Sequence, residues 1–138
     1  MTNKLQDGQI YRYPFNWLRQ AKLGLTEGEK SRPCCLTMKV LAGTETWVYF
    51  LPISSSPPLS GDLALEIPPI EIKRAGLSEF KKAWIYFEFN KDILEKSWYF
   101  NASEPPIGAV SPAFFARVVL GLRAAAKVGR LSTVNRRT

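Results

Sequence analysis

Histidine is absent from the 138-residue sequence, and cysteine occurs only twice. The lack of histidine excludes Ser-His-Asp and Cys-His nucleophilic sites, and it excludes nuclease chemistry that uses paired histidines. Two cysteines without histidine also cannot form the usual zinc site. Any catalysis must therefore use arginine, carboxylate, hydroxyl or amide groups.

Long hydrophobic runs are missing as well. No apolar run approaches the roughly 20 residues that a membrane-spanning helix needs, and residues 1–7 are polar, unlike a signal peptide. Cys34 and Cys35 are adjacent, so in a strand their side chains point to opposite faces and an ordinary disulfide between them is not expected. These features predict a soluble protein of a reducing cytoplasm, with no membrane contact.

Acidic residues are in the minority. The chain has 12 Asp and Glu against 19 Lys and Arg, a net charge of +7. This balance favours nucleic acid or an acidic protein as a partner, although it also fits simple solubility. No acidic residue follows Glu104, whereas cations accumulate in the tail at Arg117, Arg123, Lys127, Arg130, Arg136 and Arg137. The tail is either a core-packing helix with a solvated basic face or a surface that contacts a polyanion.

Length and composition fit one globular domain spanning residues 1–138, with flexible ends at 1–7 and 131–138. Short runs of alternating or β-branched and aromatic residues predict strands at 8–13, 34–40, 46–53, 63–67, 83–90 and 98–101. Ser111 and Pro112 begin an amphipathic C-terminal helix, and Pro68 and Pro69 begin a helical turn that Gly76 ends. Many short strands followed by a helix predict a small, mainly β barrel.

The second and third predicted strands are joined by the short turn 42–44, which favours an antiparallel hairpin. Such a hairpin brings the start of one strand beside the end of the other. Arg32 and Ser54 then meet at one rim of the sheet. The two side chains also have ordinary alternatives: Arg32 can pair with Glu29 or Glu88, and Ser54 can bond the backbone of its own turn.

A connection of about eighteen residues precedes Arg32, and connections of this length are more often functional than idle. It includes an aromatic residue and cations of the kinds that hold single-stranded RNA, namely Trp17, Arg19, Lys22 and Lys30. Trp17 can alternatively anchor the loop to the domain. Four aromatic residues are assigned to the core or to a dimer interface: Trp47, Trp84, Tyr86 and Phe87.

The order of these features resembles the PemK/MazF/Kid family of bacterial toxins. The matching elements are Gly8-x-Ile10-Tyr11, Lys30-x-Arg32-Pro33 and Leu51-Pro52-Ile53-Ser54. Residues 52–58 are similar to the Pro-Ile-Thr-His-x-Pro-Pro run of a plasmid-type PemK-like subgroup. Further positions that match that subgroup are Ile67-Pro68, Lys73, Gly76-Leu77, Trp84, Glu88-x-Asn90 and Gly108. Ser54 stands where the family has threonine, Ser55 where the subgroup has histidine, and residues 91–98 replace its Trp-Pro-Gly-Pro-Asp segment.

The resemblance implies an SH3-like barrel, a homodimer, a small acidic antitoxin and cleavage of mRNA without metal or cofactor, leaving a 2′,3′-cyclic phosphate. Arg32 would grip the phosphate and Ser54 would donate a hydrogen bond to it. The general base stays open among Glu88, Glu27 and Glu29. The predicted RNA contacts extend to Ser55, Ser56, Glu88 and Asn90, and Asn90 has the alternative of capping a turn.

Two other functions remain open. A catalytically weakened module on the same fold would bind nucleic acid or antitoxin, and the serines at positions 54 and 55 motivate this alternative. A gyrase poison like CcdB shares the barrel, but that class lacks the Arg-Pro and Pro-Ile-Ser/Thr pair.

Overall fold

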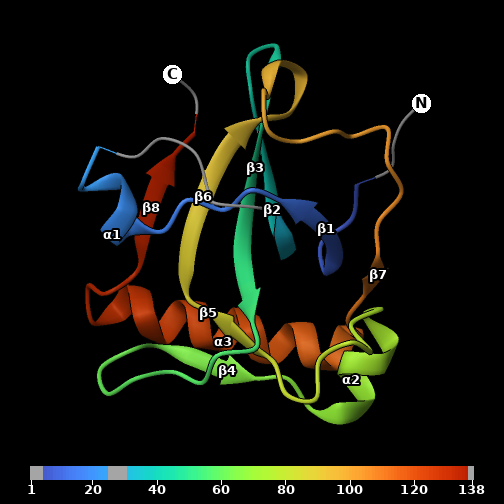
Figure 1. Ribbon diagram of the computed structural model, residues 1–138. Helices are drawn as coiled ribbons and strands as arrows, with labels where there is room; N and C mark the ends of the chain where they lie inside the picture. Colours follow the sequence, from blue (N-terminus) through green and yellow to red (C-terminus); the bar gives the residue numbers. More distant parts are fainter. Residues whose placement is uncertain (1–4, 25–30, 137–138) are drawn as a thin grey trace.

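The computed structural model describes residues 5–24 and 31–136, which form a mainly β structure with few helices (Figure 1). In chain order its elements are β1 (Gln9–Tyr13), α1 (Leu18–Ala21), β2 (Arg32–Ala42), β3 (Glu45–Ser54), β4 (Ala64–Glu66), α2 (Pro69–Arg74), β5 (Trp84–Tyr86), β6 (Glu88–Ile93), the 3₁₀ turn η1 (Leu94–Lys96), β7 (Gly108–Ala109), α3 (Pro112–Lys127) and β8 (Ser132–Asn135). Within the described ranges no helix has the length and apolar character needed to cross a bilayer.

The β2–β3 hairpin is the centre of the sheet. Its two strands pair antiparallel from Cys34 opposite Pro52 to Ala42 opposite Glu45, as the sequence predicted. Gly43 supplies the turn at a φ of +63°, in the left-handed region that favours glycine. The other edge of β3 pairs first with β6 and then, at its end, with β5. Both edges of β3 are therefore occupied, and its last residues lie between β2 and β5.

The predicted closed barrel is not what the strand pairing shows. Among the described residues β4 pairs only with β5, and β7 pairs only with β1, so the eight-stranded sheet stays open. β8 branches from β6 in a parallel pairing and does not reach either edge. The chain therefore has the predicted mainly β class with a C-terminal helix, but the two edge strands, β4 and β7, do not pair to close a barrel.

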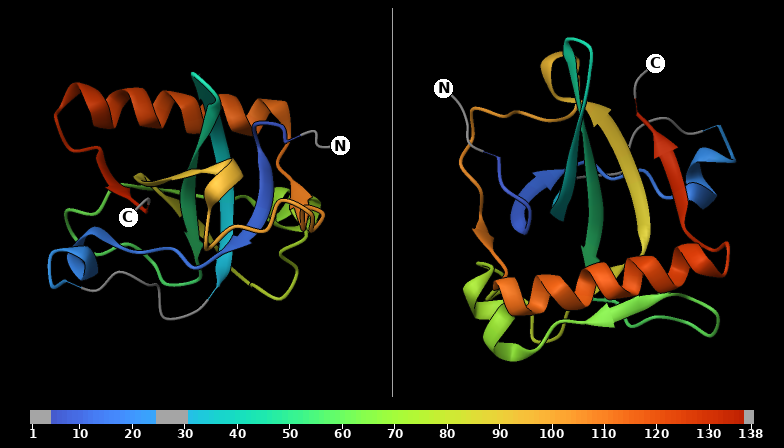
Figure 2. Two further views of the ribbon diagram at one scale, coloured as in Figure 1. Left: turned by 90° about the horizontal axis from the view of Figure 1, so that it is seen from above. Right: turned by 180° about the vertical axis from the view of Figure 1, so that it is seen from behind.

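Two hydrophobic clusters fill the opposite faces of the hairpin. Cys35, Leu51 and Ile53 belong to the cluster under α3, whereas Cys34 and Phe50 belong to an aromatic cluster on the other face. Figure 2 shows α3 lying across one side of the sheet. The two cysteines are free and fully buried on opposite faces, as predicted, and burial raises the pKa of the Cys35 thiol to about 12.

The predicted helix begins where expected. The Ser111 hydroxyl accepts a hydrogen bond from Phe114 N at 3.1 Å, and Pro112 occupies the first turn of α3. The buried carboxylate of Glu71 on α2 accepts from both the Ser111 backbone N–H (2.9 Å) and its hydroxyl (2.5 Å). The start of α3 is therefore fixed to α2 by a polar contact as well as by packing.

The single strand predicted at 83–90 is wrong, because β5 and β6 are separate strands that break at Phe87. The Phe87 ring lies flush against α3 at Gly121, where a Cβ atom would come within 2.2 Å of the ring. The strand predicted at 98–101 is also wrong. There the backbone N–H groups of Tyr99 and Phe100 bond to the Ser97 hydroxyl at 3.0 and 2.8 Å instead of to a neighbouring strand.

The ends predicted to be flexible, 1–7 and 131–138, form packing and strand contacts in their described parts. Leu5 is buried in the aromatic cluster, and β8 pairs with β6 along residues 132–135. Arg136 is only 3% exposed, and its guanidinium donates to the Pro14 carbonyl at 2.6 Å. Both ends are held because they supply buried groups that the composition of the tails does not reveal.

Candidate functional site

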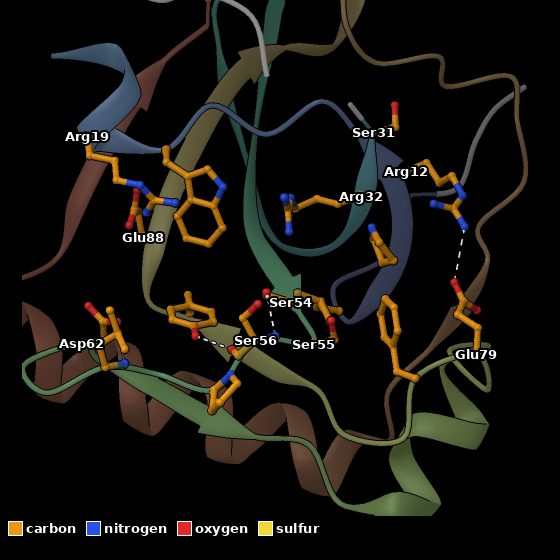
Figure 3. A pocket seen from close by; sticks show the side chains of 17 residues that line it. Arg12, Arg19, Ser31, Arg32, Ser54, Ser55, Ser56, Asp62, Glu79 and Glu88 are labelled. Atoms are coloured by element: carbon orange, nitrogen blue, oxygen red, sulfur yellow. Dashed lines mark hydrogen bonds and ion pairs between the residues drawn. The ribbon is translucent and has the colours of Figure 1, made fainter. Parts of the chain in front are cut away.

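A cleft of about 990 Å³ lies at the rim of the sheet where β2 begins and β3 ends (Figure 3). β2 contributes Arg32 to its lining, and β3 contributes Ser54. Trp17, from the segment leading into α1, and Glu88, at the start of β6, close it from the side. The cleft thus gathers side chains from segments that are far apart in the chain.

The predicted meeting of Arg32 and Ser54 is found in the structure. β2 and β3 pair Cys34 with Pro52, and continuing this register by two residues places Arg32 opposite Ser54. Both side chains line the cleft, where Arg32 points into the open space (Figure 3). A hairpin register set by a short turn is therefore enough to bring these two groups together.

Arg32 carries a charge that no described residue neutralises. The alternative of an ion pair with Glu88 is not observed, and Glu29 lies outside the described residues. Its Nε is buried and has no hydrogen-bond partner within residues 5–24 and 31–136. The Nη groups form no hydrogen bond or ion pair with a described residue, so their donors remain available for an incoming anion.

Ser54 has a structural role as well as a place in the cleft. Its hydroxyl oxygen accepts a hydrogen bond from Ser56 N at 3.1 Å, which is the turn-stabilising alternative predicted for this residue. The Tyr86 phenol donates to the Ser56 carbonyl at 2.6 Å and fixes the same loop. The hydroxyl proton of Ser54 is not used in these bonds, so Ser54 can still donate to a bound group. Ser55 and Ser56 also line the cleft.

Glu88 is half-buried at the edge of the cleft. Its Oε1 accepts a hydrogen bond from Leu18 N at 2.6 Å. Burial raises the pKa of the Glu88 carboxyl above its ordinary value, and the nearby Asp62 charge acts in the same direction. The hydrogen bond from Leu18 and the charge of Arg19 oppose this rise without cancelling it. A carboxylate with a raised pKa is a stronger base than an exposed one.

Trp17 is only 6% exposed and belongs to the aromatic cluster, so its alternative role as an anchor is realised. The Arg19 guanidinium carbon lies 5.0 Å from the indole centroid, and that of Arg32 lies 5.5 Å from it. Tyr86 meets the same ring edge-on at 5.5 Å. The indole therefore joins two of the arginines that line the cleft, Arg19 and Arg32, to the core.

Other predicted RNA contacts lie elsewhere. Lys22 is exposed but does not line the cleft. Asn90 is fully buried, and its amide accepts from Asn16 N at 2.7 Å and donates to Asn16 O at 2.8 Å, which excludes contact with a base edge in this structure. Lys30 and the candidate bases Glu27 and Glu29 lie outside the described residues.

Three charged residues of the cleft were missed from the sequence. Arg12 lines the cleft and pairs with Glu79 at 3.6 Å, and Asp62 lies on the opposite wall near Glu88 (Figure 3). Strand alternation marks Arg12 as outward-facing between the buried Tyr11 and Tyr13. Glu79 and Asp62 lie in loops, where periodicity carries no signal.

The arrangement suits a phosphodiester. One unpaired guanidinium can bind two non-bridging oxygens, a neighbouring hydroxyl can donate to the same group, and a carboxylate can accept a proton. Within the described ranges no three His, Cys, Asp or Glu side chains gather as a metal site would require. Comparison with protein-family models, with curated proteins and with solved structures gives no match for this chain.

Proposed function

We propose that this protein is an endoribonuclease toxin of the PemK/MazF/Kid type, which cuts single-stranded RNA and so inhibits growth. The observation that carries the proposal is the Arg32 guanidinium, which faces the cleft beside Ser54 without an acidic partner among the described residues. Arg32 is half-buried, and its buried Nε has no hydrogen bond to a described residue, which is costly, so its retention favours a ligand that supplies negative charge. A phosphate diester is the anion that a fork of N–H donors binds best.

In the proposed reaction the 2′-hydroxyl oxygen of RNA attacks the adjacent phosphorus and the bond to the 5′-oxygen breaks. The free oxygen of Glu88 accepts the proton of the 2′-hydroxyl, and the departing 5′-oxygen takes a proton from water in the open cleft. The hydroxide that this leaves takes the proton from Glu88, which restores the carboxylate. Arg32 binds the non-bridging oxygens, whose negative charge grows in the transition state, and Ser54 donates to one of them. The products are a 2′,3′-cyclic phosphate and a 5′-hydroxyl.

The proposal includes the further properties that the family resemblance implies. The open sheet would be a variant of the SH3-like barrel, the active form would be a homodimer in the bacterial cytoplasm, and an acidic antitoxin would neutralise it. The net charge of +7 supports an acidic protein or RNA as partner, because opposite charge accelerates association.

The direct test is incubation of the purified protein with mixed RNA in the presence of a chelator. We expect fragments that end in a 2′,3′-cyclic phosphate. Ser54→Ala should lower the cleavage rate by about tenfold, the effect of one lost hydrogen bond to a charged group. Gel analysis before and after acid opening of the cyclic ends measures both the rate and the chemistry.

Thr37→Ala is the matched control, because the Thr37 hydroxyl donates to the Tyr49 carbonyl on the same hairpin but lies away from the cleft. Its cleavage rate should equal that of the wild type. Tight RNA binding without cleavage would favour the alternative, a module that binds nucleic acid or antitoxin. Equal cutting by the wild type and Ser54→Ala would remove Ser54 from the site.

The pH dependence of cleavage tests Glu88 as the base. The rate should rise as Glu88 loses its proton, and since burial raises the pKa of this carboxyl, the rise should be centred above the ordinary glutamate value of 4.5. Glu88→Gln should abolish this acidic limb and lower the plateau by about 100-fold. Glu66→Gln, at an exposed glutamate of β4, is the control and should keep the wild-type profile. An unchanged profile in Glu88→Gln would assign the base to another group.

A further inference from the structure

We infer that Trp17 is a positioning residue for Arg32 and not a platform on which an RNA base stacks. The inference rests on the proposed function, since it concerns how the phosphate-binding arginine is held. The ring has little free surface, because Trp17 is only 6% exposed. Phe15 and Tyr86 both approach it edge-on, with centroids 5.2 and 5.5 Å away.

Two cations already lie over the indole ring. Arg19 and Arg32 both place their guanidinium carbons over the ring, at 5.0 and 5.5 Å from its centroid. A nucleobase stacks on an aromatic side chain by lying over the same π-face. A base that stacks on a face covered by Arg19 or Arg32 would therefore have to displace that arginine.

The contact holds Arg32 without using its donors. A cation over an aromatic ring is attracted by its charge and its flat face, so the N–H groups at the guanidinium edge stay free. A carboxylate partner would hold the arginine equally well but would occupy the fork that phosphate needs. Because the Arg32 guanidinium has no hydrogen bond or ion pair to another described residue, the indole is what orients it.

The backbone on both sides of Trp17 is fixed to β6. Asn16 N donates to Asn90 Oδ1 at 2.7 Å, and Asn90 Nδ2 donates back to Asn16 O at 2.8 Å. On the other side Leu18 N donates to Glu88 Oε1 at 2.6 Å. The indole cannot move away from Arg32 without breaking these bonds, most of which are buried.

A double-mutant cycle tests the inference on binding alone. The probe is a single-stranded RNA with 2′-O-methyl groups, which cannot be cut through its 2′-oxygen. Trp17→Leu should weaken its binding by about tenfold, the effect of losing a desolvated cation–π contact. Added to Arg32→Ala, the same change should weaken binding less than about twofold, because Trp17 acts through Arg32. Trp17→Phe, which keeps a π-face, should restore most of the affinity.

Trp47→Leu is the matched control. Trp47 is half-buried and also carries a cation, the Lys91 ammonium, 5.0 Å from its ring, but it lies outside the cleft. The affinity of the Trp47→Leu variant for the probe should equal that of the wild type. Additive losses from Trp17→Leu and Arg32→Ala would overturn the inference, since a stacking platform contributes independently of Arg32.

A second readout serves if Trp17→Leu does not fold. The indole N–H signal of Trp17, identified by its loss in Trp17→Phe, should shift in the NMR spectrum of Arg32→Ala. An unchanged signal would contradict the contact. If the coupling is present but the wild type does not cleave RNA, the nuclease proposal fails and the positioning role stands. A wild type that binds no strand at all would overturn both.

Discussion

Replacing Arg32 by alanine is expected to lower RNA cleavage by about 100-fold to 1,000-fold, the usual effect of removing one donor that stabilises a developing oxyanion. Arg32→Lys should lose less, because lysine keeps the charge but not the planar fork that binds two oxygens. Initial rates on one defined single-stranded substrate, with all proteins at equal concentration, measure the difference.

The same substitution is expected to leave the fold intact. The Nε of Arg32 is buried without a hydrogen-bond partner among the described residues, so removing it relieves an unfavourable group. Arg32→Ala also loses the cation–π contact with Trp17, which opposes this gain, so its free energy of unfolding should stay close to that of the wild type. Loss of activity together with preserved stability is the pattern of a residue kept for binding.

Arg12→Ala is the control for charge. Arg12 lines the same cleft, but its guanidinium already pairs with Glu79 at 3.6 Å, and both side chains are about half exposed. We expect its cleavage rate to fall by less than about fivefold, since an exposed pair is worth little. If the cleavage rates of Arg12→Ala and Arg32→Ala fall equally, RNA recognition depends on overall positive charge and not on specific phosphate binding by Arg32.

Replacing Asn90 by alanine is expected to lower the free energy of unfolding by about 3–5 kcal/mol, since several buried polar groups lose their partners. Asn90 is fully buried, and its side chain bonds both the N–H and the carbonyl of Asn16. Its Oδ1 also accepts from Arg136 Nη1 at 3.1 Å. Urea denaturation followed by tryptophan fluorescence measures the change.

Two variants sharpen this prediction. Asn90→Asp keeps an oxygen acceptor for Asn16 N but loses the donor to Asn16 O, so its loss of stability should be smaller than that of Asn90→Ala. Asn101→Ala removes an exposed asparagine whose bonds are local to Ser103, and it should unfold like the wild type. If Asn90→Ala were as stable as the wild type and only RNA binding were weakened, Asn90 would be a base-reading residue, contrary to its burial.

The structural features that the sequence predicted correctly depend on interactions between residues close together in the chain. The Arg32–Ser54 pairing follows from one tight turn and a strand register that hydrophobic alternation fixes. The opposite orientation of Cys34 and Cys35 follows from the period of two in a strand. Helix α3 begins at its predicted cap because Ser111 and Pro112 satisfy local backbone requirements.

The features that the sequence did not predict depend on contacts with residues distant in the chain, which a local sequence pattern does not identify. The run at 83–90 has ideal strand composition, yet it breaks at Phe87 because that ring packs against α3 at Gly121. Asn90 was predicted to contact RNA, but folding places its side chain in the core, where it bonds to Asn16, 74 residues earlier. The tail beyond Leu131 has the composition of a flexible end, yet it forms β8.

The sequence by itself determined the hairpin, the meeting of Arg32 with Ser54 at its rim, and the chemical groups that remain without histidine. These properties are encoded within about twenty neighbouring residues, where turn length and alternation suffice. Only the tertiary structure decided that Trp17 covers Arg32, that Glu88 lies at the cleft with a raised pKa, and that Asn90 is buried. Each of these results from long-range packing and desolvation, which arise only when distant segments come together and exclude water.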